Sequence, residues 1–344
     1  MGVDARRVLE LISSWPTVPL GAWPTPIERH AHPSLGELLV KRDDLARFGR
    51  RGVSGVKARK LETFIGYLVH EKYDELVMPL ANMTNLGHDI VPPLNRWGVR
   101  CRLLIVNDPP MPAAIREVLF EDVRDHAELL GRSRAFAIGR LAAAVATARV
   151  SGGRPIGVLP SPGHPSAVIG SARGFVEMVE QLRSRGDALP RTVFVSAAAG
   201  ATVAGFALAS ALLRSRGVAD VRVIGVQVTS DPLRSWTRLL LRWTMKMLGM
   251  SGLPACDVEI LRLPEYAHFV RFDDSLEDLC ERVHDRFGLQ IDPIYGGKSW
   301  SAMEQHASAL CGHNGPTMFW HCGYTPDWRT FRRPYEETEA LSAC

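Results

Sequence analysis

Apolar runs of strand length alternate with helical segments along most of this chain, and that alternation constrains its fold more than any other feature. The strand-like runs occupy residues 37–44, 74–80, 99–108, 191–196 and 221–230. Strands that alternate with helices predict an α/β fold whose mainly parallel sheets are covered by helices on both faces. Ligands of such folds bind at the carboxyl ends of the strands.

The length and composition of the chain favour two lobes. It has 344 residues, of which 46% are hydrophobic and 23% are charged, so it can bury a sizeable core and is not a disordered chain. Two sets of strands and helices predict a small lobe of residues 63–158 and a large lobe of residues 1–62 and 159–344. The Pro- and Gly-containing segment 159–174 joins the two sets.

Charge and cysteine content exclude several classes of protein. The 41 basic and 37 acidic residues are spread along the chain, so we expect no basic stripe and no nucleic-acid partner. The six cysteines include no CxxC pair and no grouping with histidine at zinc spacing, which predicts reduced thiols and no metal site. No signal peptide or membrane-length apolar run is found, so we expect a soluble, cytoplasmic protein with small-molecule partners.

The segment 231–253 is expected to form a helix with one apolar stripe, which at this spacing is typical of a core-facing helix. The predicted stripe consists of Trp236, Leu239, Leu240, Trp243 and Met247.

The turn after the strand at 191–196 contains only small residues from Ala197 to Ala201, and Thr202 follows. The backbone amides of small residues approach an anion closely, and a helix N-terminus adds a favourable dipole. The same composition also allows tight packing of a helix on a sheet. A phosphate site and a packing turn therefore both stay open at this point.

Three glycines, Gly49, Gly52 and Gly55, precede a helix that carries Lys57 and Lys60 about one turn apart. Two interpretations fit this pattern. The lysines could form a solvated cationic face, or one of them could be held in place for chemistry.

These stretches together resemble a known family of enzymes. The specific signals are "KRDDL" at 41–45, "KARKLE" at 57–62 and "DPIYGGK" at 292–298, supported by "TPIERH", "NMTNLG", "AAAGATVAG" and "MFWHCGY". From about Pro24 to Tyr324 the chain is similar to pyridoxal-phosphate enzymes of the tryptophan-synthase β class. It is most similar to the branch that holds 1-aminocyclopropane-1-carboxylate (ACC) deaminase and D-cysteine desulfhydrase.

The resemblance implies a two-lobed fold-type-II structure with mainly parallel, twisted sheets covered by helices. It implies pyridoxal 5'-phosphate as the cofactor, a small amino acid as the substrate and a homodimer as the assembly. On this basis the chain is expected to be a lyase or deaminase that depends on this cofactor.

The resemblance also assigns roles to individual residues. Lys57 matches the lysine that forms the Schiff base with the cofactor, and Lys60 matches the lysine that reaches the phosphate. Asn85 matches the asparagine that bonds the phenolic oxygen, and Tyr295 matches the tyrosine beside the ring, placed for stacking or proton transfer. Thr84 keeps the hydroxyl of the family serine in the loop around the substrate carboxylate. The positions that match the phosphate cup and the neighbour of the pyridine nitrogen are Ala199, Gly200, Ala201, Thr202 and Cys322.

Several positions depart from the family pattern. Val56 replaces the asparagine before the lysine, Met83 and Leu86 replace polar residues of the substrate loop, and Gly296 replaces a glutamate of the deaminase. Because neither Gly296 nor Cys322 offers a carboxylic acid to the ring nitrogen, we predict α,β-elimination that gives ammonia and a 2-oxo acid, as in D-cysteine desulfhydrase. The alternatives are an ACC-deaminase-like ring opening, a β-replacement or diverted reaction in a specialised pathway, and a non-catalytic relative that binds the cofactor.

Other polar residues receive structural interpretations. Asp43 and Asp44 are expected to brace the glycine loop, and His321, at the end of a predicted strand, is expected to anchor backbone. A lone histidine is more often a structural residue than a catalyst.

Overall fold

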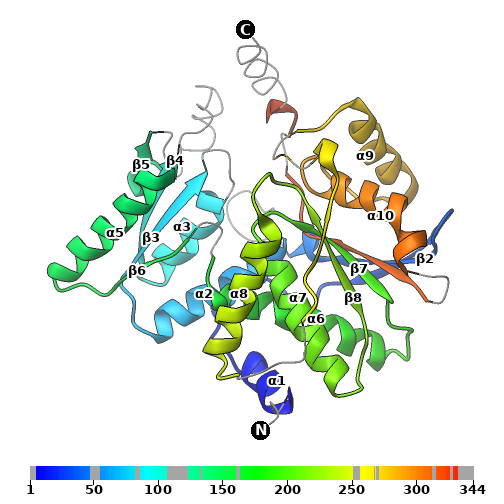
Figure 1. Ribbon diagram of the computed structural model, residues 1–344, viewed down its shortest axis with the longest axis horizontal. Helices are drawn as coiled ribbons and strands as arrows, with labels where there is room; N and C mark the ends of the chain where they lie inside the picture. The colour runs from blue at the N-terminus through cyan, green and yellow to red at the C-terminus, as the bar shows by residue number, and fades with distance from the viewer. Residues whose placement is uncertain are drawn as a thin grey trace.

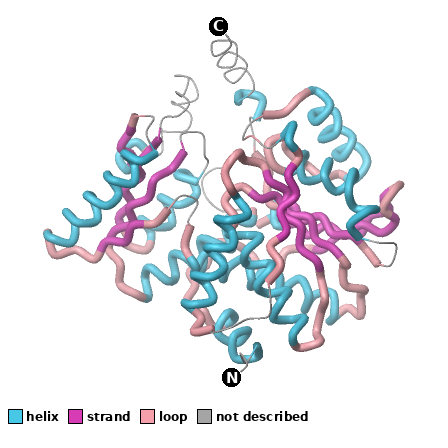
Figure 2. The backbone as a smooth tube through the Cα atoms, viewed as in Figure 1, coloured by secondary structure: helices cyan, strands magenta, loops and turns pink. Residues whose placement is uncertain are grey.

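Two separate sheets form the framework of the protein (Figures 1 and 2). The computed structural model describes residues 5–46, 55–81, 86–106, 123–131, 134–159, 163–250, 256–266, 268, 271–311, 315–325 and 328–331. One sheet has six strands in the order β1-β2-β10-β7-β8-β9, and the other has four in the order β5-β4-β3-β6. The α/β arrangement expected from the alternation of strands and helices is therefore present.

The six-stranded sheet is parallel except for the β1–β2 hairpin. Its strands are β1 (Ile27–His32), β2 (Gly36–Arg42), β7 (Thr192–Ala197), β8 (Arg222–Gln227), β9 (Glu259–Arg262) and β10 (Thr317–His321). Alternate side chains of each strand point to opposite faces. Leu39, Val193 and Trp320 join one core cluster, whereas Leu38, Phe194 and Phe319 join the cluster on the other face. Both faces are thus buried, as expected for a parallel sheet.

Two groups of helices cover those faces. On one face lie α1 (Ala5–Ser13), α6 (Pro165–Ser184), α7 (Ala201–Ser215) and α8 (Leu233–Met247). On the other lie α9 (Asp274–Phe287) and α10 (Gly296–Cys311), whose Leu276 and Trp300 are buried against the sheet. Short 3-10 helices occupy Asp43–Leu45 (η1), Arg124–His126 (η2), Pro264–Tyr266 (η3) and Trp328–Phe331 (η4).

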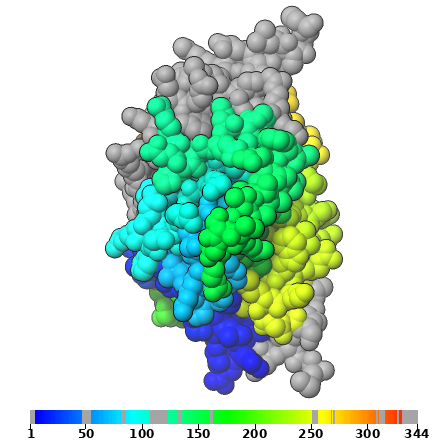
Figure 3. Space-filling view, turned by 90° about the vertical axis from the view of Figure 1, so that its left-hand side faces the viewer, coloured from blue at the N-terminus to red at the C-terminus, as the bar shows by residue number. Residues whose placement is uncertain are grey.

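The four-stranded sheet is parallel throughout. Its strands are β3 (Glu75–Ala81), β4 (Arg100–Val106), β5 (Ala127–Leu130) and β6 (Pro155–Gly157), and its helices are α3 (Leu86–Arg96) and α5 (Arg134–Val150). α5 covers one face of this sheet, while α3 and the helix α2 (Val56–His70) cover the other. In Figure 3 this part of the chain, from cyan to green, faces the viewer, and yellow residues of the larger part lie along one flank.

Helix α2 connects the two sheets. Its Leu61, Phe64 and Leu68 are buried with α3 and β3, whereas its other side packs on α6. The expected lobe boundary between residues 62 and 63 falls inside this helix. The division into residues 63–158 and the remainder therefore stays a proposal. None of the helices in the described ranges is long and apolar enough to cross a membrane.

Helix α8 forms within the expected segment, but its buried face differs from the predicted stripe. The buried residues are Leu233, Thr237, Leu240, Leu241 and Thr244. Of the predicted stripe only Leu240 is buried, and Trp243 is 39% exposed. The two threonines are accommodated in the core because each hydroxyl donates to a carbonyl one turn back, at 2.8 Å in both cases.

The outer side of α8 corrects a second expectation. This helix contains no acidic residue, and its four cations are exposed and recur every fourth position: Arg234, Arg238, Arg242 and Lys246. Residues four apart lie on the same side of a helix. The expectation of no basic stripe is therefore wrong here, because an even charge distribution along a sequence does not exclude alignment on one helix.

Candidate active site

The first turn of α2 is joined directly to the chain that follows β10. The N–H of Val56 donates to the carbonyl oxygen of Cys322 at 2.7 Å. Gly55, with φ of 48°, allows this approach, since a Cβ at that position would lie 1.9 Å from the same oxygen. Lys57, the second residue of α2, is thereby held near the carboxyl end of a central strand.

Lys57 forms an ion pair that the sequence interpretation missed. Its Nζ donates to Oδ2 of Asp89 at 2.7 Å, and the two side chains are 30% and 10% exposed. Asp89 lies in the first turn of α3, where an acidic residue also complements the helix dipole. The only sequence signal for it was an acid just beyond the "NMTNLG" stretch.

Lys60 lies one turn after Lys57 and is half-buried. Burial lowers the pKa of its amine to about 8, and the nearby Lys57 acts in the same direction, while Cys322 and Asp89 partly offset the shift. No side chain in the described ranges forms a hydrogen bond or ion pair with this amine. The two lysines thus lie close enough to interact electrostatically, and both are half-buried rather than fully solvated.

The small-residue turn forms the N-terminus of α7. Gly200 is the N-cap residue with φ of 79°, and no side chain caps the helix. A Cβ on Gly200 would lie 2.4 Å from Oγ1 of Thr237 on α8. The carbonyl oxygen of Ala199 accepts a 3.1 Å hydrogen bond from Nε1 of Trp236, and Thr202 is 6% exposed. The turn is thus held from behind by α8, and no side chain caps the N-terminus of α7.

Tyr295 is oriented by Asp292, a second carboxylate that the sequence interpretation did not single out. Oδ1 of Asp292 accepts from the N–H groups of Ile294 and Tyr295 at 3.0 and 2.8 Å, and Oδ2 accepts from that of Thr325 at 3.1 Å. Asp292 therefore ties the turn that carries Tyr295 to the chain after Cys322. Complete burial raises the pKa of its carboxyl to about 6.

The Tyr295 side chain is a neutral phenol near neutral pH. Burial raises the pKa of its hydroxyl above the usual value, and the nearby carboxylates of Asp292 and Asp89 add to the shift. Its carbonyl oxygen accepts a 3.2 Å hydrogen bond from the Ser196 hydroxyl at the end of β7. Tyr295 is thus fixed to the strand that leads into the α7 turn.

Cys322 is a neutral thiol in this surrounding. Burial raises the pKa of the thiol to about 12, and Asp43 adds to the effect, while Lys60 opposes it. Gly296 begins α10, and a Cβ there would lie 2.9 Å from Cβ of the buried Ile291. Neither Cys322 nor Gly296 carries a carboxylic acid in its side chain.

A buried polar network holds the opposite side of α2. The Arg59 guanidinium donates twice to Asp43, both at 2.8 Å, and twice to Glu177, both at 2.9 Å. Although burial acts to raise it, the Arg59 charge holds the pKa of the Asp43 carboxyl below its usual value. Asp43 also accepts from the indole N–H of Trp320 at 2.8 Å, so this carboxylate links α2 to strand β10.

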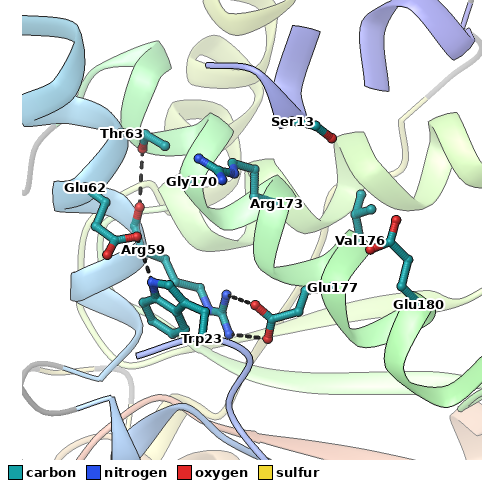
Figure 4. Close-up of a pocket in the computed structure, with 10 residues that line it drawn as sticks. All are labelled: Ser13, Trp23, Arg59, Glu62, Thr63, Gly170, Arg173, Val176, Glu177 and Glu180. Carbon is teal, nitrogen blue, oxygen red and sulfur yellow. Dashed lines mark hydrogen bonds and ion pairs between the residues drawn. The ribbon is translucent and has the colours of Figure 1, made fainter. Parts of the chain in front are cut away.

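Figure 4 shows the pocket of about 200 Å³ beside this network. Arg59 and Glu177, joined directly by two hydrogen bonds, are among the residues that line it, and Glu62 on the next turn of α2 accepts a 2.8 Å hydrogen bond from Nε1 of Trp23. Asp43 therefore braces α2, and Asp44 pairs with Arg42 at 2.8 Å. The glycine loop itself, including Gly49 and Gly52, lies outside the described residues.

His321 anchors backbone, as expected, because its Nε2 lies 2.9 Å from the carbonyl oxygen of Gln290. Thr84, Asn85 and Met83 lie outside the described residues, so their expected contacts stay predictions. Among the described residues, no group of three or more His, Cys, Asp or Glu side chains converges as a metal site.

No family model matches the chain. It is, however, similar in sequence to several characterised proteins and in fold to several solved structures. It is 28% identical over 311 residues to a 1-aminocyclopropane-1-carboxylate deaminase of Variovorax paradoxus, covering 81% of this chain and 85% of that protein. The solved structure of an ACC deaminase homologue superposes with a TM-score of 0.72 at 20% identity, covering 92% of this chain and 94% of the other. The Escherichia coli diaminopropionate ammonia lyase superposes with a TM-score of 0.60 at 16% identity, over 96% and 89% of the two chains. The expected fold, that of the fold-type-II pyridoxal-phosphate enzymes, is confirmed.

Proposed function

Because the chain has the fold of the fold-type-II pyridoxal-phosphate enzymes and is related in sequence to ACC deaminases, we propose that it is a lyase that depends on this cofactor and deaminates a small amino acid. The observation that carries the proposal is that Asp89, which pairs with the Lys57 amine, also acts electrostatically on the Lys60 amine and on the Tyr295 hydroxyl. The Lys57–Asp89 and Val56–Cys322 contacts and the hydrogen bond from Ser196 to Tyr295 support it.

The residues fit the chemistry of pyridoxal 5'-phosphate. A phosphate needs hydrogen-bond donors, which the uncapped N-terminus of α7 and the Lys60 amine offer. The aldehyde needs a reactive amine, and Lys57 offers one. When bound, this cofactor supplies an electron-withdrawing ring that weakens the bonds at the substrate Cα.

Each residue then has a definite task. Lys57 serves as the attachment point and, once displaced by the substrate amine, as the base that takes the α-proton. Tyr295, a neutral phenol held by Asp292, donates a proton or packs beside the ring. Asn85 is proposed to bond the phenolic oxygen of the cofactor, and Thr84 to bond the substrate carboxylate.

Elimination is the preferred reaction class. The Cys322 thiol is too weak an acid to protonate a ring nitrogen, and Gly296 has no side chain. A less electron-withdrawing ring suits loss of a good β leaving group better than the opening of an unactivated ring, which favours a D-cysteine-desulfhydrase-like elimination to ammonia and a 2-oxo acid. ACC ring opening is the second candidate, favoured by the names of the relatives. A homodimer and a cytoplasmic location complete the proposal.

The proposal is tested by loading the purified protein with pyridoxal 5'-phosphate and reducing it with borohydride. Peptide mapping should find the cofactor on Lys57, and a label on another lysine would overturn the assignment. The loaded protein is then given both enantiomers of cysteine and serine, their O- and S-substituted analogues, and ACC. Release of ammonia and 2-oxo acid from β-substituted substrates supports elimination, whereas turnover of ACC alone would establish the deaminase alternative.

A further inference from the structure

Asp89 is the carboxylate that directly contacts the candidate catalytic lysine. Its Oδ2 lies 2.7 Å from Nζ of Lys57, and its side chain is 10% exposed. Lys57 belongs to α2 and Asp89 to α3, so the pair connects two helices through residues that are 32 positions apart in the sequence. A charge-assisted hydrogen bond of this length in a partly buried site is among the stronger polar contacts in proteins.

Two other buried carboxylates near the site, those of Asp292 and Asp43, are bonded to groups other than Lys57. Asp292 accepts three backbone N–H groups with its two oxygens. Asp43 faces Arg59 on the far side of α2. Asp89 contacts the Lys57 amine itself, so its carboxylate is placed to respond when the charge of Lys57 changes.

We propose that Asp89 is a positioning residue for Lys57, one that orients the amine and stabilises the ammonium formed when the amine takes the substrate α-proton. This inference rests on the function proposed above. In the step, the Cα–H bond of the substrate breaks and an N–H bond forms on Lys57; pyridoxal 5'-phosphate, when bound, would take up the electron pair of the broken bond. The positive charge that appears on Lys57 lies next to the Asp89 carboxylate. The carboxylate of a Ser-His-Asp catalytic triad acts in the same way: it orients the histidine base and stabilises its protonated form.

The hydrogen bond between Lys57 and Asp89 should hinder an earlier step, the attack of the Lys57 amine on an electrophile. The Lys57 amine must be unprotonated to attack an aldehyde or any other electrophile. Because Asp89 holds the Lys57 Nζ in a 2.7 Å hydrogen bond, it hinders the approach of that atom to an electrophile, although it helps the later removal of a proton.

The test compares Asp89→Asn, Asp89→Glu and the parent, with Glu75→Gln as a matched control. Glu75 is likewise a buried carboxylate, but it is the first residue of β3 in the four-stranded sheet and pairs with Arg102 at 2.9 Å. The first readout uses the protein without cofactor. Labelling of Lys57 by acetic anhydride is followed by mass spectrometry, with the exposed Lys246 as the internal reference.

The second readout is exchange of the substrate α-proton with deuterated water in the loaded protein. Asp89→Asn should label at Lys57 several-fold faster than the parent and exchange the α-proton about 10- to 100-fold more slowly, the range for a hydrogen bond to a charged group. Asp89→Glu, which keeps the charge, should fall between the parent and Asp89→Asn, and Glu75→Gln should match the parent in both readouts.

Three outcomes decide the question. Faster labelling together with slower exchange supports the positioning role. Unchanged exchange, or slower labelling and slower exchange together, overturns it even if the enzyme is active. If the parent exchanges no α-proton with any amino acid tested, the proposed function fails, and the proposed part of Asp89 in proton removal fails with it. Should Asp89→Asn lose its thermal transition, Asp89→Glu decides by the same criteria.

Discussion

The Val56 N–H and the Cys322 carbonyl oxygen form a 2.7 Å hydrogen bond that fixes the first turn of α2 to the end of β10. This contact brings a helix that begins at residue 56 to a strand that ends at residue 321. It sets the position of Lys57 relative to the rest of the candidate site. The contact depends on the absence of a side chain at residue 55.

We therefore expect Gly55→Ala to destabilise the fold and to displace Lys57. A Cβ at residue 55 would lie 1.9 Å from the Cys322 oxygen, in addition to the cost of the positive φ of 48°. Gly186→Ala is the matched control, because Gly186 also has positive φ but nothing lies within 4 Å of its Cβ position. Backbone strain alone costs about 1–3 kcal/mol. Urea denaturation should show a clearly larger loss for Gly55→Ala, and equal losses would refute the close-contact argument.

The Asp43–Arg59 pair predicts a large effect of removing one partner. Asp43→Asn should lower the free energy of unfolding by about 3–5 kcal/mol, because the buried guanidinium loses its main counter-ion. Glu10→Gln, which breaks an exposed pair with Arg6, should leave stability nearly unchanged. Similar losses in the two variants would show that the buried network is not a brace.

The same pair predicts a pH dependence of stability in the acid range. The pKa of the Asp43 carboxyl is lowered in the folded protein, so the unfolded chain binds its proton first as the pH falls. The stabilising contribution is complete above the usual aspartate pKa of about 3.9. It is lost as the pH falls from there through the lower folded value. Denaturation curves between about pH 5 and pH 2.5 should converge for the parent and Asp43→Asn.

Lys60 predicts a pH dependence of anion binding. Its amine has a pKa of about 8 in the protein without ligand, so it is charged below that pH and increasingly neutral above it. Affinity for inorganic phosphate should therefore fall as the pH rises from about 7.5 to 9.5. Lys60→Met should bind phosphate about 10- to 100-fold more weakly at pH 7 and lose this pH step, as followed by titration calorimetry. A Lys60→Met variant that binds like the parent would identify Lys60 as a bystander.

Removing the Tyr295 hydroxyl should lower the turnover rate much more than it lowers the affinity for the cofactor. Tyr295→Phe keeps the ring and its backbone hydrogen bond to Asp292 but removes the phenolic proton. If the hydroxyl transfers a proton, kcat should fall about 10²- to 10⁴-fold while the cofactor Kd changes little. Tyr73→Phe serves as the control, since the Tyr73 ring makes a tilted contact with Tyr67, with ring centroids 6.1 Å apart, in the cluster beside the four-stranded sheet. An unchanged kcat would restrict Tyr295 to packing.

Local features of the candidate site were readable in the sequence because they depend on neighbours along the chain. Lys57 and Lys60 share a helix face through helical periodicity, and the small residues at 197–201 precede a helix N-terminus. The helix at 231–253 was also recognised by its period, but its buried face was not. Trp236 and Trp243 looked like core residues, whereas the surrounding elements bury Thr237 and Thr244 instead.

By itself, the sequence determined the alternation of strands and helices, the parallel sheets and the two lysines on one helix, since each follows from spacing of a few residues. Only the tertiary structure decided which distant groups meet there: Asp89 with Lys57, Asp43 with Arg59, and Asp292 with the amides of Tyr295 and Thr325. These pairings depend on which strand ends and helix starts pack side by side. A hydrogen bond requires its atoms within about 3 Å, and sequence spacing cannot supply that for residues tens of positions apart.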